Sequence, residues 1–241
     1  MFNENYQEFQ DPSIRTVVQS MRATQIHYNN ALLYTMNVDT PGYIEIGGYN
    51  SLDRDGVIQM IPFYRWRAGP VVETLRPLDF YIDAVGKGFF QVSLPTGLGF
   101  TRDGRFTLDS RRKLVMLAGN FPVLGERGEI FLPEGDEIAV SKTGLIFVDG
   151  APVDRMKVVV FTEKGINQLD TVNGSIFILS GEGELNSAAD YSVRQGFIEQ
   201  NNIIKALIGD ISSAKNTYEA SAKAGKAIIK EMNSAIQLGA P

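Results

Sequence analysis

Residues 203–238 read IIKALIGDISSAKNTYEASAKAGKAIIKEMNSAIQL, and this run decides the predicted fold. Its apolar and small residues recur in alternating steps of four and three, and it contains no proline. That spacing places them on one stripe of a long helix, in a pattern typical of a coiled coil. The stripe consists of Ile204, Ile208, Ile211, Tyr218, Ala222, Gly225, Ile229, Met232 and Ile236, and Lys215 interrupts it.

A shorter stripe of the same kind lies near the other end of the chain, within residues 14–36. Asp11-Pro12-Ser13 offers N-cap chemistry before it, and Asp39-Thr40-Pro41-Gly42 stops the helix. A helix with one apolar stripe is not stable alone in water, so each terminal helix needs the other helix, neighbouring subunits, or both. The members of this stripe are Ile14, Val18, Met21, Tyr28 and Leu32, with Gln25 filling the gap.

The middle of the chain, about residues 78–185, changes to strand-like sequence. Short runs rich in β-branched and aromatic residues alternate with turn pairs such as Asp103-Gly104 and Asn173-Gly174. This pattern predicts an antiparallel β domain. The expected fold class is therefore α+β, with N- and C-terminal helices forming a coiled-coil-like core around a central antiparallel β domain. The expected segments are an N-terminal helical assembly segment (1–43), a linker or extended segment (44–77), the β-rich domain (78–185) and a C-terminal helical assembly segment (186–241).

The composition excludes several functional classes. The chain has 241 residues, a net charge of -5 and a pI near 5.0, so it lacks the basic surface that nucleic acid requires. It has no cysteine, which excludes disulfides and thiolate metal sites. The N-terminal residues show neither the basic nor the apolar region of a cleaved signal peptide. No window approaches the roughly 18 continuous apolar residues of a membrane span, so we expect no membrane insertion.

No group of residues predicts catalysis. His27 is the only histidine, and the chain has no Gly-x-Ser-x-Gly elbow for a serine nucleophile. Asp53-Arg54-Asp55-Gly56 begins like a calcium loop, but Tyr64 stands where a bidentate glutamate is required. Gly86-Lys87-Gly88 lacks the spacing of a phosphate-binding loop. We therefore expect no enzyme activity, no cofactor, no metal site and no small-molecule substrate.

Five blocks of sequence, in one order, resemble the bacterial flagellar rod and hook proteins. Residues 36–43, MNVDTPGY, resemble the family signature Ala-Asn-Val-Asn-Thr-Pro-Gly-Tyr, and residues 195–202, QGFIEQNN, resemble its Gly-x-Leu-Glu-x-Ser-Asn segment. Chain length and Arg76-Pro77-Leu78-Asp79 favour the proximal-rod member over the distal-rod member. The remaining blocks are residues 86–92 with 100–106, residues 114–115 with 121–125, and residues 218–223.

The resemblance implies a structural subunit of the basal-body rod that self-assembles into a helical tube and transmits torque. Its implied partners are copies of itself, other rod proteins and the flagellar type III export apparatus. The implied location is the rod in the periplasmic space, reached without a cleaved signal peptide, and the two apolar stripes would be the assembly interface. A hypothesis from another class is a secreted β-domain enzyme or adhesin with oligomerising helices. About a dozen residues precede the point where the first helix of the family normally begins.

Overall fold

The computed structural model describes residues 12–52, 58–84, 87–181, 185 and 190–238. The chain divides into two compact units, one built on the terminal helices and one built on strands. The described residues of the first unit fall within Met1–Met36, Ile46–Phe63 and Ile204–Pro241, and those of the second within Asn37–Glu45 and Tyr64–Ile203.

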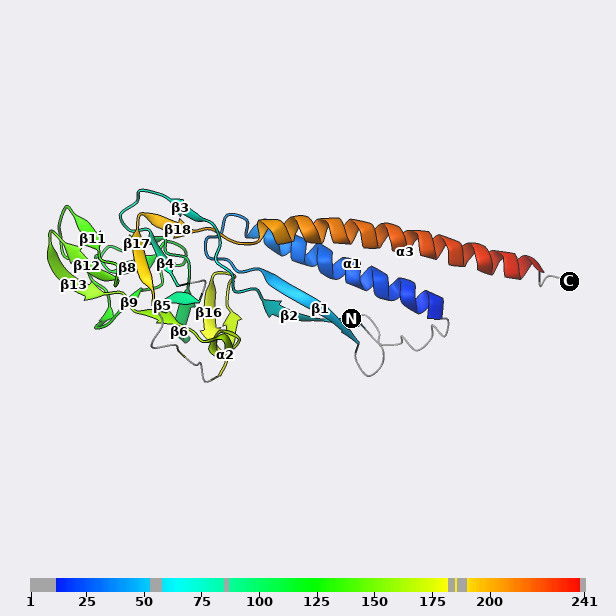
Figure 1. Cartoon of the computed structure of the whole chain (residues 1–241), viewed down its shortest axis with the longest axis horizontal. Coiled ribbons are helices and arrows are strands. Elements are labelled where there is room, and N and C mark those ends of the chain that lie inside the picture. The colour runs from blue at the N-terminus through cyan, green and yellow to red at the C-terminus, as the bar shows by residue number, and fades with distance from the viewer. Residues whose placement is uncertain (1–11, 53–57, 85–86, 182–184, 186–189, 239–241) are drawn as a thin grey trace. The chain divides into compact units, whose positions relative to one another are not determined.

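The first unit pairs two long helices, α1 (Pro12–Met36) and α3 (Ile204–Leu238), and so confirms both helices predicted from the sequence. They lie side by side and antiparallel (Figure 1). The direction follows from two contacts, since His27 meets Asp210 whereas Val17 lies nearest Gly225. α1 ends before Pro41 as expected, because the residue before a proline is pushed out of the helical region.

The segment 44–77, expected to be a linker or extended segment, contains three strands. β1 (Ile46–Leu52) and β2 (Ile58–Tyr64) pair in a two-stranded sheet that runs alongside α1 (Figure 1). The hydroxyl of the buried Tyr34 on α1 donates a hydrogen bond to the carbonyl of Ile46, which anchors the sheet to the helix. β3 (Val71–Glu73) belongs to the second unit and pairs with β18 (Phe197–Glu199).

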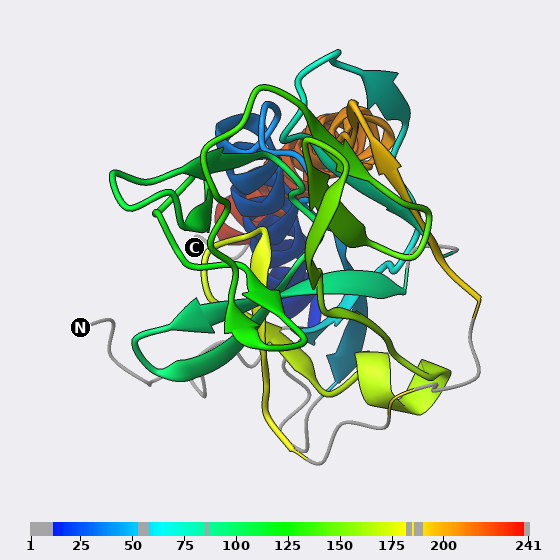
Figure 2. The same cartoon turned by 90° about the vertical axis from the view of Figure 1, so that its left-hand side faces the viewer.

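The second unit arranges its strands in several small antiparallel sheets. A five-stranded sheet has the order β14-β5-β6-β16-β15, and a three-stranded sheet has the order β11-β12-β13. Figure 2, turned by 90° from Figure 1, shows that these sheets face in different directions. The central antiparallel β domain is therefore confirmed. The remaining elements are β4 (Phe80–Asp83), β5 (Gly88–Leu94), β6 (Gly97–Thr101), β7 (Phe106–Leu108), β8 (Leu114–Met116), β9 (Leu124–Gly125), β10 (Gly128–Glu129), β11 (Ile138–Val140), β12 (Leu145–Val148), β13 (Ala151–Arg155), β14 (Val158–Val160), α2 (Glu163–Ile166), β15 (Leu169–Thr171), β16 (Ile176–Leu179) and β17 (Ser192–Gln195).

Two apolar clusters hold this unit together. The larger one fills the space between the small sheets and includes the fully buried Phe80, Phe106 and Met116. The smaller one is aromatic: the ring of Trp66 lies edge-on to Phe177 and Phe89, with centroids 5.3 and 5.9 Å apart. Such edge-to-face pairs add about 0.5–1.5 kcal/mol beyond the area they bury, so this cluster stabilises the unit well.

Candidate assembly site

α1 and α3 pack along a line of small and polar side chains, called here the seam. Ala214 and Ser221 of α3 and Ala31 of α1 are buried there. Small side chains allow close approach of two helices but bury little apolar surface. The rest of the seam consists of the partly buried residues Val17, Ser20, Thr24 and His27 on α1 and Asp210, Thr217 and Gly225 on α3.

Four polar side chains of the seam have hydrogen-bond partners. The hydroxyls of Thr24 and Ser221 donate to carbonyls one turn earlier in their own helices, at 3.0 and 2.7 Å. His27 Nδ1 lies 3.0 Å from Asp210 Oδ1, and this pair bridges the two helices. The single histidine of the chain is therefore a packing residue of the helix pair.

The apolar stripes predicted from the sequence do not form this seam. On α3 the seam uses Ala214 and Ser221, whereas the predicted stripe passes one residue later, through Lys215 and Ala222. A step of one residue turns the helix by about 100°, so the largest apolar side chains point away from the partner helix. Coiled-coil packing along the predicted heptads is thus not confirmed within one chain. The exposed members of the stripes are Met21, Tyr28, Leu32, Ile204, Ile208, Ile211, Tyr218 and Ile229, each 47% to 62% exposed.

The other predicted stripe residues divide into two groups. Ile14, Val18, Ala222 and Gly225 are partly buried. A Cβ built on Gly225 would meet only Val17, at 4.0 Å, which is ordinary contact, so this glycine does not mark a tight helix crossing. Met232 and Ile236 lie on α3, but their side chains are outside the described part of the chain.

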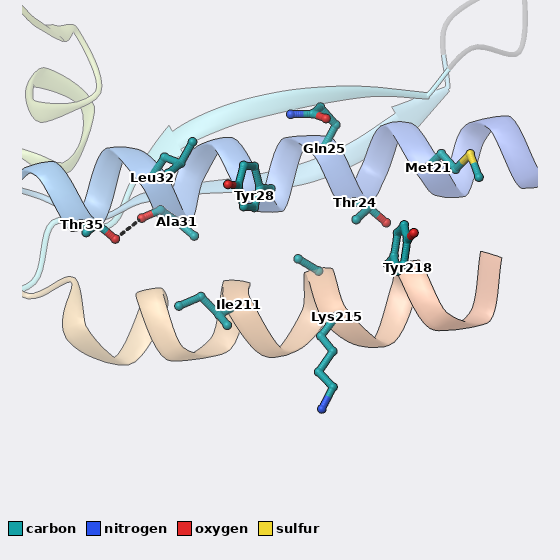
Figure 3. A pocket seen from close by; sticks show the side chains of 11 residues that line it. Met21, Thr24, Gln25, Tyr28, Ala31, Leu32, Thr35, Ile211, Lys215 and Tyr218 are labelled. Carbon is teal, nitrogen blue, oxygen red and sulfur yellow. Dashed lines mark hydrogen bonds between the residues drawn. The ribbon is translucent and has the colours of Figure 1, made fainter. Parts of the chain in front are cut away.

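An apolar groove of about 700 Å³ runs between the helices on the side of the exposed stripes (Figure 3). Tyr28 and Leu32 line it from α1, and Ile211 and Tyr218 line it from α3. The amino group of Lys215 points away from α1, so the floor of the groove stays uncharged (Figure 3). The groove is completed by Met21, Thr24, Gln25, Ala31, Thr35 and Ala214.

A second groove, of about 400 Å³, is polar. Its lining includes Ser20 and Thr16 from α1 and Asn216, Thr217 and Ser221 from α3. The helix pair therefore has one face with large apolar side chains and another with hydroxyls and amides. Only the apolar face gains substantial free energy when another apolar surface covers it.

The second unit brings three of the resembling sequence blocks together at one place, called here the junction. It comprises residues 37–45, 102–104 and 199–202. The side chain of Asn201 donates to the carbonyl of Val38, and the Gly42 amide donates to the carbonyl of Glu199 at 3.0 Å. Asn202 Oδ1 accepts the amide of Glu45 at 2.8 Å. These bonds tie the segment that follows α1 to the segment that precedes α3.

An ion pair lies at the centre of the junction. Arg102 and Glu199 are both 3% exposed, and Nη2 of the arginine contacts Oε1 of the glutamate. The same carboxylate oxygen accepts the Gly69 amide at 2.8 Å, and Arg102 Nη1 donates to the carbonyl of Arg67 at 3.4 Å. Because each charged group has further hydrogen bonds, burial of this pair is tolerated.

Two glycines are required at the junction by close backbone contacts. Gly42 has a φ of 67°, and a Cβ there would lie 2.6 Å from the Asp103 amide nitrogen. A Cβ on Gly104 would lie 1.7 Å from the Phe80 carbonyl oxygen. Beside them, the buried Asp103 binds Arg105 through both carboxylate oxygens, and this hydrogen bonding raises the pKa of Arg105. The Asp103-Gly104 turn expected from the sequence is therefore also a packing element.

The residues that the sequence offered for catalysis or metal binding show no arrangement for such chemistry among the described residues. Lys87 forms an ion pair with the exposed Glu163. Asp53 and Asp55 lie outside the described residues. Within the described part of the chain, no three His, Asp or Glu side chains are grouped so that they could hold a metal ion. None of the described helices is both long enough and apolar enough to cross a membrane.

Comparison with known proteins gives one consistent family. The model of the flagellar hook protein FlgE/F/G D1 domain matches residues 84–148. The flagellar basal-body rod protein FlgF of Rhizobium meliloti is 32% identical over 144 residues, 58% of this chain and 58% of that protein. FlgF of Buchnera aphidicola (subsp. Baizongia pistaciae) is 33% identical over 114 residues, 46% of this chain and 45% of that protein. FlgF of Salmonella typhimurium is 28% identical over 205 residues, 74% of this chain and 79% of that protein.

The chain thus spans 58% and 45% of the length of the first two of these relatives. Relatives named as rod proteins do not favour the alternative of a secreted enzyme or adhesin. The matched D1 model covers β5 to β12, including the junction residues 102–104. Together these observations show that the chain is similar to the flagellar basal-body rod proteins, FlgF in particular.

Proposed function

We propose that this chain is a structural subunit of the flagellar basal-body rod, in the proximal rod, and that it self-assembles into a helical tube. The FlgF relatives support the rod and its proximal part. The observation in the molecule that carries the proposal is the exposure of the apolar stripes on both terminal helices. Large apolar side chains gathered on one face mark a surface that is covered in the working assembly.

The stripes supply favourable free energy only between subunits. Ile208 and Ile211 are 62% and 54% exposed, so covering either one buries about half of its side chain. Each such burial is worth about 1 kcal/mol. The apolar groove beside Tyr28 and Tyr218 provides the concave surface into which a helix stripe of a neighbouring copy packs. The stripes therefore act together as the assembly interface.

The junction has a mechanical role in this proposal. A torque-transmitting rod needs subunits that resist deformation. Within the strand unit, Glu199, Asn201 and Asn202 bond to residues 37–45 and to Arg102, and this network holds these segments together. A buried, fully bonded polar network permits one arrangement rather than several, which is the property a stiff connection requires.

The remaining parts of the proposal follow from the family. The partners are copies of this chain, other rod proteins and the flagellar type III export apparatus, and the location is the rod within the periplasm. Export proceeds without a cleaved signal peptide. The chain acts without catalysis, because register and stiffness are the properties that its surfaces supply.

A substitution in the exposed stripe tests the proposal. Ile211→Asp should leave the isolated chain folded, because Ile211 is exposed, yet block assembly, because a carboxylate buried between subunits costs several kcal/mol. Ser212→Asp adds the same charge one residue away and is the matched control. Each variant is expressed as the sole copy in the flagellated bacterium, and basal bodies are imaged by electron microscopy alongside a motility assay.

We expect rods to stop forming with Ile211→Asp and to form normally with Ser212→Asp. Circular dichroism of the purified variants checks that helix content is unchanged. Normal rods and motility with Ile211→Asp would remove the exposed stripe from the assembly interface. Loss of rods with both variants would show that any added charge disrupts the helix, and the assignment of the interface to this stripe would fail.

A further inference from the structure

The outer edge of the three-stranded sheet is formed by β11. The Ser141 amide donates to the carbonyl of Leu145 in β12 at 2.9 Å, so Ser141 directs its backbone groups toward β12. Successive residues of a strand direct their backbone groups to opposite edges, so Val140, and Ile138 two residues earlier, direct theirs outward. The N–H and C=O groups along such an edge need partners.

A side chain, and not a strand, binds this outer edge. Oε1 of Gln195, in β17, accepts the Val140 amide at 3.0 Å, and Nε2 donates to the carbonyl of Ile138 at 2.7 Å. The side-chain amide of glutamine offers the same donor and acceptor as a peptide group. Gln195 therefore takes the place that a peptide group of a neighbouring strand would occupy beside β11.

β17 and β11 lie side by side and run antiparallel (Figure 1). Near one end their backbones bond directly, since the Val193 amide donates to the carbonyl of Lys142 at 2.8 Å. Two residues further along β17, the contact with β11 is made by the side chain of Gln195. On its other side β17 pairs with β4, so this side chain joins the β4–β17 pair and the three-stranded sheet.

The same amide has a third backbone partner. Nε2 of Gln195 also donates to the carbonyl of Pro77, in the segment that leads into β4, at 2.8 Å. A glutamine side chain offers two N–H donors and one carbonyl oxygen, and all of them have partners here. Asparagine is shorter by one methylene group, and an ionised glutamate has no donor, so neither can reproduce this set of bonds.

We propose that Gln195 is a positioning residue, whose side-chain amide fixes the three-stranded sheet against the β4–β17 pair. Glu199, Asn201 and Asn202 of the junction follow it on the same segment. The segment 195–202 therefore holds the junction at one end and the edge of the sheet at the other. In the rod, and resting on the function proposed above, this connection keeps the strand unit rigid under torque.

Hydrogen exchange of the full chain tests the positioning. Gln195→Met keeps the length of the side chain and removes the amide, so the Val140 amide should exchange several-fold faster. Gln168→Met, at an exposed glutamine of the same unit, is the matched control and should leave this rate unchanged. The proposal is overturned if the Val140 rate stays the same in Gln195→Met, rises equally in the control, or rises only together with the rates of residues 89–94 in β5.

The pH dependence of Gln195→Glu separates hydrogen bonding from packing. A protonated carboxyl has one O–H that can donate to the carbonyl of Ile138, whereas an ionised carboxylate has none. Relative to the wild type at the same pH, protection of the Val140 amide should be largely restored at about pH 4 and lost at about pH 7. In Gln195→Met the loss should be equal at both pH values. A loss in Gln195→Glu that does not change with pH would overturn the role of the amide.

Motility tests the mechanical role. With Gln195→Met as the sole copy, rods should form, because the helices are unaltered, but the bacterium should swim more slowly in a viscous medium than the Gln168→Met strain. Equal speeds, or a loss of rods with Gln195→Met, would overturn this role. Failure of the rod function itself would appear separately, as normal rods with Ile211→Asp, and the exchange measurements on the unassembled chain do not depend on it.

Discussion

Removal of Glu199 should destabilise the strand unit far more than removal of an exposed glutamate. Glu199→Ala leaves the guanidinium of Arg102, which is 3% exposed, without its carboxylate. Breaking a buried ion pair by deleting one partner costs about 3–5 kcal/mol. The Gly69 amide also loses its acceptor, which adds about 1 kcal/mol. For a unit of this size the total corresponds to a fall in Tm of about 10 °C or more.

Glu163→Ala is the matched control, because Glu163 also pairs with a basic residue, Lys87, but is 82% exposed. Exposed pairs contribute about 0–1 kcal/mol, so its Tm should hardly change. Both variants of the full chain are unfolded thermally and in urea, with near-ultraviolet circular dichroism reporting on the aromatic cluster. Combining Arg102→Ala with Glu199→Ala then measures the coupling free energy between the two residues. Equal, small losses for Glu199→Ala and Glu163→Ala would refute the reasoning.

Three further substitutions test separate parts of the structure. Gly104→Ala should lower the free energy of unfolding by several kcal/mol, because the added Cβ would lie 1.7 Å from the Phe80 carbonyl oxygen. Gly209→Ala is the control, since Gly209 faces open space on α3, and its free energy of unfolding should not fall. Urea titration of both variants measures the difference. A strain with His27→Gln should form normal rods and stay motile, because the bridge to Asp210 is partly exposed and the glutamine amide can keep a hydrogen bond to it. Normal rods without motility would instead indicate a chemical role for His27. Burial raises the pKa of Tyr43, so this tyrosine ionises first in the unfolded chain as the pH rises above 10, and the free energy of unfolding falls there. Tyr43→Phe should make this fall less steep in unfolding curves measured at alkaline pH. An unchanged slope in the variant would contradict the prediction.

The sequence predicted most elements of the fold because they depend on local patterns. Frequent glycine turns and runs such as residues 89–92 and 145–148 predicted strands that the structure contains as β5 and β12. The hairpin of β1 and β2 was not predicted. Its sequence contains Gly47, Gly48 and Pro62, which weaken a strand signal, and its position is fixed by a contact with Tyr34 that is distant in sequence.

The seam could not be predicted from periodicity. The most apolar stripe on each helix gives the strongest periodic signal in the sequence. Because apolar residues are usually buried, this stripe would be assigned to the contact between the two helices. The chain instead pairs its helices through Ala31, Ala214 and Ser221, which give almost no signal. The blocks at residues 36–43, 100–106 and 195–202 were recognised by resemblance, but their convergence at the junction depends on tertiary contacts that no local pattern reports.

The separation of seam and stripe limits how stable the helix pair can be in a single chain. Burial of a methylene group is worth about 0.8 kcal/mol, and the small seam residues Ala31, Ala214 and Ser221 provide few of them. Ordering the backbone costs about 1–2 kcal/mol per residue, and α1 and α3 have 25 and 35 residues. The large apolar side chains that would offset this cost, such as Ile208 and Tyr218, are exposed and contribute only when another subunit covers them. In the proposed assembly neighbouring subunits supply the missing free energy, so we expect rigid helices to form as the chain is incorporated.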